Sequence, residues 1–217
     1  MNKTIRNILL VTACVWNLSA FALDEHGRQR LDYLQQSWAE INYRMSPNER
    51  ESAFERLDGE ARQAIADAPA SAELLIWHGI IQASWAREKG GLGALDLVKQ
   101  ARANLEAALA LDSTALDGSA YTSLGSLYYQ VPGWPIAFRD DKRAEALLKK
   151  ALELNPDGID PNYFLGDFLF REKRYDESRD ALLRAQAAAA RPGRELADDG
   201  RRAEIAALLA KVDKQLN

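Results

Sequence analysis

Residues 121–128 read YTSLGSLY, and residues 144–156 read AEALLKKALELNP. The same order of residue types returns further along the chain as NYFLGDFL at 162–169, followed by SRDALLRA at 178–185. In each copy, the glycine of the first segment would let a second helix approach closely, and the small residues of the second segment fall at helical spacing. Neither pair of segments can bury its apolar stripe alone. The sequence therefore predicts helix pairs that stack on one another.

Two weaker copies of the pattern lie upstream. LIWHGIIQ at 75–82 and ARANLEAALALDS at 101–113 form one of them, and its spacing is stretched by an insertion that contains residues 88–93. The other copy is degenerate, and it begins with apolar residues at helical spacing from Leu31 to Ile41. The repeat therefore extends over most of the chain.

These copies resemble the signature of the tetratricopeptide repeat (TPR), which the segment 121–156 fits best. The resemblance implies an all-α fold, a TPR-type helical-hairpin solenoid of about three to four repeats with a C-terminal capping helix. A generic helical bundle is the alternative. We expect a signal peptide at 1–22 and a single domain at 23–217. The units expected within that domain are a degenerate helix pair at 24–70, a stretched repeat at 72–114, a repeat with a loop insertion at 118–157, a repeat at 159–192 and a capping helix at 195–216.

The first 22 residues have the order of an export signal. Two basic residues precede a short apolar run at 8–18, and residues 20–22 read AFA, a small-x-small cleavage pattern. The run is shorter than the roughly 20 residues that a membrane-spanning helix needs, and a buried core helix is the alternative. We predict a periplasmic or secreted protein after cleavage near Ala22. Cys14 follows VTA in a pattern that resembles the lipobox of bacterial lipoproteins, so a lipid anchor at Cys14 is the other interpretation.

Composition and charge argue against several classes of partner. The chain is 47% hydrophobic and 28% charged, with a formal net charge of −4. Removal of residues 1–22 takes away two basic residues and no acidic residue, so the net charge becomes −6. An acidic chain without a basic cluster is a poor candidate for binding nucleic acid or an anionic membrane surface. We expect neither nucleic-acid binding nor a direct membrane span.

Motifs for catalysis and for cofactors are missing from the sequence. No cysteine remains after signal cleavage, and His26 and His78 do not have the spacing of metal ligands. No phosphate-binding loop and no nucleophile elbow occur. We therefore predict no enzymatic activity, no cofactor and no metal. The alternative is an unfamiliar catalytic centre with Asp160 or Asp167 beside Tyr163.

The TPR resemblance implies that the first helices of the repeats line a concave face. TPRs that bind cytosolic chaperones hold a C-terminal carboxylate there with Lys, Asn and Arg. At the matching positions this chain has hydroxyl, aromatic and acidic residues, so a carboxylate would meet like charge, and an amine, a basic peptide or a polar small molecule would suit the face better. The alternative for the aromatic residues is packing against neighbouring helices. The groove residues that the resemblance implies are Ile76, Ile80, Ser119, Thr122, Ser126, Tyr129, Asp160, Tyr163, Asp167 and Phe170.

A second candidate site is the segment VPGWPIAFRDD at 131–141, where a short turn would suffice. Trp134 and Phe138 are large apolar groups on this loop, and they either bind a ligand or fold back onto the protein. The loop and the DDKRAE helix start at 140–145 are similar to the T component of periplasmic TRAP transporters. That TPR-like family associates with a substrate-binding protein, so the resemblance implies a transporter subunit or a small polar ligand as partner.

Two functional hypotheses result. The leading one is an exported TPR scaffold or adaptor that binds a protein or peptide partner through its concave face. The alternative is a periplasmic accessory of a transport system, similar to the TRAP T component, with a small-molecule pocket near PGWP at 132–135.

Overall fold

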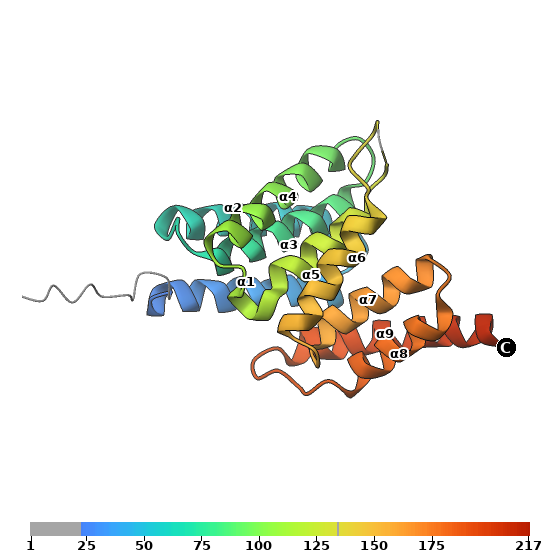
Figure 1. The fold of residues 1–217 in the computed structure, drawn as a ribbon. Helices are drawn as coiled ribbons and strands as arrows, with labels where there is room; N and C mark the ends of the chain where they lie inside the picture. Colours follow the sequence, from blue (N-terminus) through green and yellow to red (C-terminus); the bar gives the residue numbers. More distant parts are fainter. Residues whose placement is uncertain (1–22, 134) are drawn as a thin grey trace, which may run out of the picture.

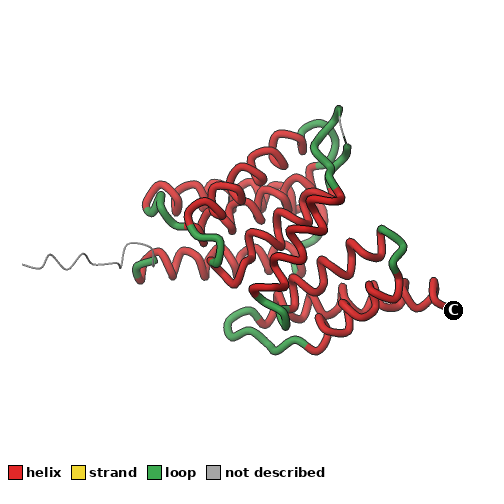
Figure 2. The backbone as a smooth tube through the Cα atoms, in the orientation of Figure 1, coloured by secondary structure: helices red, strands yellow, loops and turns green. Residues whose placement is uncertain are grey.

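Residues 23–133 and 135–217 are described by the computed structural model, so the predictions for the signal at 1–22, for Cys14 and for Trp134 lie outside the described residues. The described part of the chain contains helices and no strand, which confirms the predicted all-α class (Figures 1 and 2). Its helices are α1 (Glu25–Tyr43), α2 (Pro47–Asp67), α3 (Ala72–Lys89), α4 (Ala94–Leu111), α5 (Ala115–Gln130), α6 (Asp141–Leu154), α7 (Ile159–Arg171), α8 (Tyr175–Ala187) and α9 (Glu195–Leu216).

The helices form hairpins that stack in the order of the sequence. Each odd-numbered helix from α1 to α7 packs against the even-numbered helix that follows it, and each hairpin packs against the next one. Figure 1 shows α5 and α6 between the blue-green N-terminal hairpins and the orange-red C-terminal ones. This arrangement confirms the prediction of a TPR-type helical-hairpin solenoid. None of the helices within the described ranges is long and apolar enough to cross a membrane.

The repeated glycines sit where two helices of one hairpin touch. A Cβ atom added to Gly125 would lie 2.9 Å from Cγ of Leu148, and one added to Gly79 would lie 2.8 Å from Cγ of Leu105. Gly166 has the same relation to the Leu182 side chain, at 2.7 Å. Because any side chain at these positions would push the second helix away, the glycine of the motif sets the close spacing of each hairpin.

The stretched repeat carries its additional length in its helices. The helices α3 and α4 are each 18 residues long, whereas α7 and α8 are each 13 residues long. The turn between α3 and α4 covers only residues 90–93, and Gly90 and Gly91 adopt positive φ angles there. The additional residues therefore lengthen both helices of this hairpin.

A buried polar network joins α2, α3 and α4 around His78. Its Nε2 lies 2.8 Å from Oδ1 of Asp58, and its Nδ1 lies 3.0 Å from Nδ2 of Asn104. Burial raises the pKa of Asp58, but the hydrogen bond and the charge of His78 outweigh burial and leave this pKa below its ordinary value. His78 therefore has a structural role between helices.

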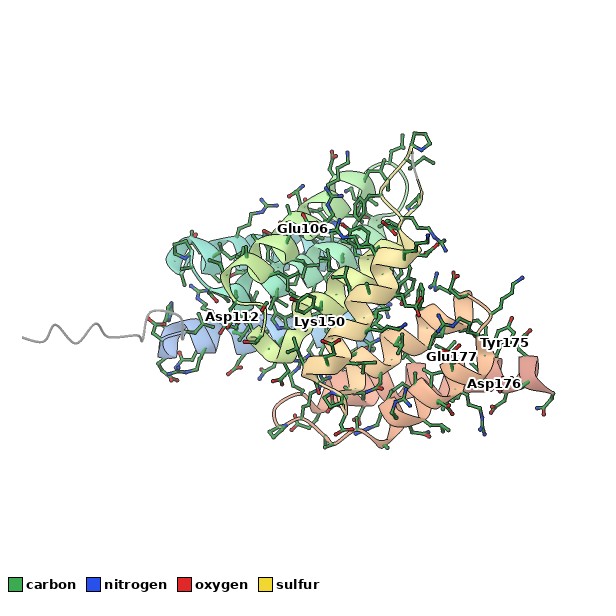
Figure 3. All side chains as sticks on the ribbon, in the orientation of Figure 1. Glu106, Asp112, Lys150, Tyr175, Asp176 and Glu177 are labelled. Carbon is green, nitrogen blue, oxygen red and sulfur yellow. The ribbon has the colours of Figure 1, made fainter. Side chains whose placement is uncertain are left out.

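The outer helices carry a charged surface. Lys150 on α6 pairs with Glu153 at 2.7 Å, and Arg143 on α6 reaches Glu106 on α4 at 3.3 Å. In Figure 3 the labelled Glu106, Lys150 and Glu177 lie on the outer helices α4, α6 and α8. Exposed pairs of this kind contribute little to stability.

The last helix does more than cover the last hairpin. Its C-terminal half packs Ile205, Leu208 and Val212 into a cluster with Leu182 of α8. Its N-terminal half continues past α7 and packs against α1. The five helices α1, α3, α5, α7 and α9 therefore form a closed ring, in which each contacts its two neighbours. The open concave groove expected from the TPR resemblance is closed in this protein by α9.

Candidate functional site

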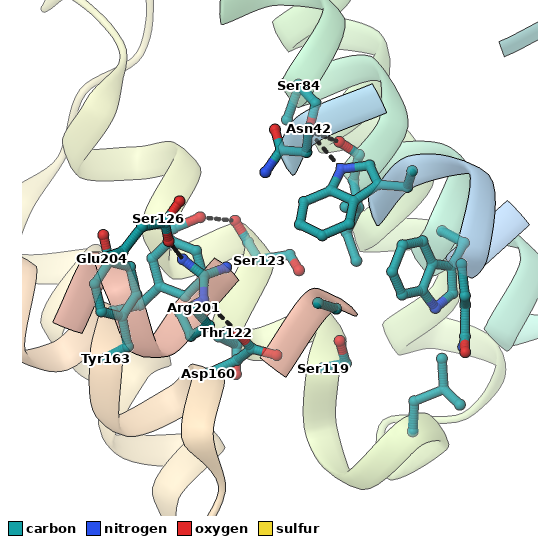
Figure 4. A pocket seen from close by; sticks show the side chains of 18 of the residues that line it. Asn42, Ser84, Ser119, Thr122, Ser123, Ser126, Asp160, Tyr163, Arg201 and Glu204 are labelled. Atoms are coloured by element: carbon teal, nitrogen blue, oxygen red, sulfur yellow. Dashed lines mark hydrogen bonds and ion pairs between the residues drawn. The ribbon is translucent and has the colours of Figure 1, made fainter. Parts of the chain in front are cut away.

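A cavity of about 440 Å³ lies inside the ring of inner helices, and all five of these helices contribute to its wall (Figure 4). A volume of this size is typical of sites for small ligands or for a few side chains of a polypeptide.

The wall formed by α1 and α3 is aromatic and apolar. The rings of Trp38 and Trp77 meet edge to face with their centroids 5.9 Å apart, and Ile80 and Ala83 line the cavity beside them. The indole N–H of Trp38 donates to Oγ of Ser84 at 2.8 Å, which fixes the orientation of this ring. This side of the cavity can accommodate an apolar group.

Helix α5 presents a strip of hydroxyl groups. Ser119, Thr122, Ser123 and Ser126 recur at helical spacing and all line the cavity. The Ser126 hydroxyl donates to the backbone carbonyl of Ser123 at 2.8 Å, as Figure 4 shows. The remaining hydroxyl groups of the strip provide donors and acceptors for a polar part of a ligand.

The start of α5 has an uncommon backbone. Leu116 and Asp117 adopt φ angles of 49° and 54°, followed by Gly118 at 75°. Left-handed backbone costs a residue with a side chain roughly 1–2 kcal/mol. This turn places Leu116 and Asp117 at the cavity wall. Strained residues of this kind cluster at functional sites.

The wall formed by α7 and α9 is charged, and its centre is Asp160. Arg191 Nη1 and Arg201 Nε donate to the two carboxylate oxygens of Asp160 at 2.7 and 2.8 Å. Burial raises the pKa of Asp160, but the charges of Arg201 and Arg191 outweigh burial and hold this pKa at about 2. The Arg201 guanidinium also lies over the ring of Tyr163, 4.3 Å from its centroid.

The second predicted acid of the groove is also engaged. Asp167 Oδ2 accepts the hydroxyl of Tyr129 at 2.8 Å and the Nε–H of Arg171 at 3.1 Å. Both acidic residues that led us to expect repulsion of a carboxylate are therefore compensated by arginines from the same wall. A carboxylate ligand would therefore not meet uncompensated negative charge at Asp160 or Asp167 in the folded protein. Arg191 and Arg201, which pair with Asp160, lie outside the aligned segments of the repeat.

The structure brings part of the predicted groove set to one cavity. Those that line it come from α3, α5 and α7, because the repeats place them on the inner face of the solenoid. They are Ile80, Ser119, Thr122, Ser126, Asp160, Tyr163 and Asp167.

Four other predicted site residues lie away from the cavity. Ile76 and Tyr129 are fully buried in the core between hairpins, and Tyr129 packs on Phe168 of α7. Phe170 packs against Tyr175 with ring centroids 5.7 Å apart. Phe138 packs against Tyr128 of α5. These aromatic side chains serve packing, which was the alternative interpretation of the groove aromatics.

The loop at 131–141 does not contribute to the cavity through any of its described residues. Phe138 lies edge to face on Tyr128, with ring centroids 5.4 Å apart, and the guanidinium of Arg102 stacks on its other side at 4.5 Å. Asp140 ends the loop as the N-cap of α6 and accepts the backbone N–H of Arg143 at 2.9 Å. The described part of the loop thus packs between α5 of its own hairpin and α4 of the preceding one.

Sequence reasoning missed the contributions of the first and the last helix. Trp38, Asn42 and Tyr43 of α1 line the cavity, and so do Arg194 and Arg201 at the start of α9. The available signal was the series of arginines from 191 to 202, which falls partly on one face of α9. It was overlooked because 195–216 was interpreted only as an outer cap.

Comparisons with known proteins add a resemblance of fold. No family model matches the chain, and no curated protein matches it. Among solved structures, MamA is 20% identical, with 77% of this chain and 92% of that chain covered and a TM-score of 0.45. A thermophilic TPR protein from Thermus thermophilus is 16% identical, with coverages of 85% and 99% and a TM-score of 0.45. PilF from Pseudomonas aeruginosa is 15% identical, with coverages of 88% and 92% and a TM-score of 0.35.

Proposed function

We propose that this chain is a non-enzymatic adaptor that receives a short segment of a partner protein in the cavity inside its helix ring. The observation that carries this proposal is the convergence of all five inner helices on one cavity with aromatic, hydroxyl and charged walls. Such a mixed lining is typical of recognition sites, in which apolar groups supply affinity and a few polar groups fix orientation. The size of the cavity suits a chain end or one to two side chains of the partner.

The charge states of the cavity argue against the enzymatic alternative. A general acid or base works best when its pKa lies near the operating pH. The pKa of Asp160 is held at about 2, and burial raises the pKa of Tyr163 to about 12. Asp167 is occupied by Tyr129 and Arg171. Asp160 and Tyr163 therefore each remain in one protonation state near neutral pH, which suits a binding site.

The transporter-accessory hypothesis placed a small-molecule pocket near residues 132–135. No described residue of that loop lines the cavity, and Phe138 packs against Tyr128 of α5 and Arg102 of α4 instead. The site therefore favours the adaptor over a pocket at the loop.

We propose that the adaptor acts outside the cytoplasm after export. The support is the order of basic residues, apolar run and small-x-small pattern within 1–22. The intact mass of the protein recovered from a periplasmic fraction tests this proposal. A mature chain that starts at Leu23 is expected, an acylated chain that starts at Cys14 would establish the lipid anchor, and an uncleaved chain would refute export by this signal.

Filling the cavity is expected to abolish partner binding. Ser123→Trp places a large ring among the hydroxyl groups of α5, whereas Ala146→Trp adds the same ring on the exposed side of the outer helix α6. In affinity purification from a periplasmic extract, we expect Ser123→Trp to reduce recovery of the partner at least about tenfold, because the site is occupied. Ala146→Trp should recover the wild-type amount. Equal recovery of every bound protein by wild type and both variants would rule out the cavity as the binding site.

A further inference from the structure

One cation of the cavity lacks a counter-ion. Arg194 lines the cavity at the start of α9, and its guanidinium lies over the ring of Trp77, 4.9 Å from the centroid. Its Nε is buried without a hydrogen-bond partner. Within residues 23–133 and 135–217, no carboxylate lies within ion-pair distance of Arg194.

The other arginines of the wall are all paired. Arg191 and Arg201 share Asp160, Arg171 binds Asp167 at 3.1 Å, and Arg87 reaches Glu88 at 3.1 Å. Asp198 and Glu204 also pair with Arg191 and Arg201, so Arg194 is the arginine of this cavity that forms no ion pair within the described residues. Asp117, the lining acid that forms no ion pair in the described chain, is exposed at the start of α5, so water screens it.

The environment of Arg194 is unfavourable for an unpaired charge. Burial lowers the pKa of Arg194, and the positive charge of Arg191 lowers it further, while Asp160 and Asp198 act in the opposite direction without restoring it. An arginine nevertheless stays protonated in proteins. A partly buried positive charge without a partner is costly, and a bound anion would relieve that cost.

The neighbours of Arg194 define what the anion should be attached to. The hydroxyl of Tyr43 lines the cavity and is buried without a hydrogen-bond partner, so it can donate to the same anion. The rings of Trp77 and Trp38 and the side chain of Ile80 provide an apolar wall beside it. A single free cation next to aromatic rings fits a monoanion with an apolar body better than a multiply charged, strongly hydrated phosphate.

We infer that the cavity binds a carboxylate through Arg194 and the Tyr43 hydroxyl, with the apolar body of the ligand against Trp77 and Trp38. This inference deepens the proposed function and rests on it, because it names the group that enters the cavity. The same chemistry has two sources, the C-terminal carboxylate of a polypeptide and a free organic acid. The preference is the opposite of the amine or basic peptide that the acidic residues of the sequence favoured.

Calorimetric titration of the mature chain with matched probes tests the inference. The probes are phenylacetate, its neutral isostere phenylacetamide and the cation phenethylamine. Wild type is expected to bind phenylacetate at least about tenfold more tightly than the other two, because only the carboxylate forms charge-assisted hydrogen bonds with a guanidinium. Arg194→Gln should weaken phenylacetate binding by about tenfold to a hundredfold and leave the two other probes unchanged.

Two further variants separate the site from general effects. Arg194→Lys keeps the charge and should recover part of the affinity. Arg56→Gln makes the same change of net charge on the exposed side of α2 and should bind phenylacetate like wild type. The inference is overturned if no probe distinguishes the carboxylate, if Arg194→Gln binds phenylacetate as wild type does, or if Arg56→Gln weakens binding equally.

A second pair of probes identifies the source of the carboxylate. The peptide N-acetyl-Ala-Ala-Phe is titrated with a free C-terminus and as the C-terminal amide. Tighter binding of the free peptide than of phenylacetate supports a polypeptide terminus, and the reverse order supports a free organic acid. If neither acid binds better than its amide while Ser123→Trp still loses the partner, the adaptor function stands and the carboxylate site is refuted.

Discussion

Asp160→Asn is expected to lower the free energy of unfolding by at most about 3 kcal/mol, the lower end of the range for a buried ion pair, because the Asp160 side chain is 28% exposed. The substitution keeps the shape of the side chain but leaves Arg191 and Arg201 without the anion they share. Arg201 is 8% exposed, so water cannot replace the lost partner. Because Glu204 and Asp198 still contact these two arginines, we expect a loss near the lower end of the range. Urea denaturation of wild type and variant measures it.

A neighbouring acid provides the control for this prediction. Asp199→Asn removes the same charge from an exposed position on α9, and it should change the free energy of unfolding by less than about 0.5 kcal/mol. Equal destabilisation by both substitutions would show that the effect comes from net charge or from the N-terminal turn of α9. If only Asp160→Asn lowers the free energy of unfolding, the result supports a role of the Asp160 ion pairs in stabilising the packing of α9 on α7.

The same carboxylate makes the stabilising effect depend on pH. The pKa of Asp160 in the folded protein is about 2, below its ordinary value of 3.8. Its contribution to stability is therefore complete above about pH 5 and is lost as the pH falls towards 2. The difference in unfolding free energy between wild type and Asp160→Asn should shrink over this window, because the protonated acid resembles the amide. A difference that stays constant from about pH 5 to 2 would contradict the low pKa.

The repeat could be predicted because its signal is local. Gly79, Gly125 and Gly166 each meet a leucine of the following helix at nearly the same distance, so every hairpin repeats one packing solution. The inner face of α5 and α7 follows from the same register, and Ser119 and Asp160, which are expected on that face, line the cavity. Contacts that lie within one hairpin and recur from one hairpin to the next can be predicted from residue spacing alone.

The closure of the ring and the charge balance of the cavity could not be predicted in this way. Both depend on contacts between distant segments, such as Arg191 and Arg201 with Asp160 over 31 and 41 residues. Whether α9 reaches α1 depends on the summed curvature of four hairpins, and no single motif encodes that sum. The acids of the groove were visible in the sequence, but the distant partners of Asp160 were not, and the expected ligand charge changed as a result.

Gly200→Leu is expected to open the helix ring. A Cβ atom at this position of α9 would lie 2.4 Å from two ring carbons of Tyr43 on α1, so the two helices must separate. Overpacking of this kind costs about 3 kcal/mol at the upper end of its usual range. We also expect faster hydrogen exchange in α1 and in the first turns of α9, and weaker phenylacetate binding, because Tyr43 and Arg194 would move apart.

Two controls tie this effect to the contact between Gly200 and Tyr43. Gly59→Leu makes the same substitution in the exposed face of α2, where no atom lies within 4 Å of a new Cβ, and leucine there should stabilise the helix by up to about 1 kcal/mol. Tyr43→Ala removes the ring that the new leucine strikes. The double variant Tyr43→Ala/Gly200→Leu should therefore lose less stability than the sum of the two single variants. If the losses of stability are additive and hydrogen exchange in α1 is unchanged, other contacts of α9 hold it against α1.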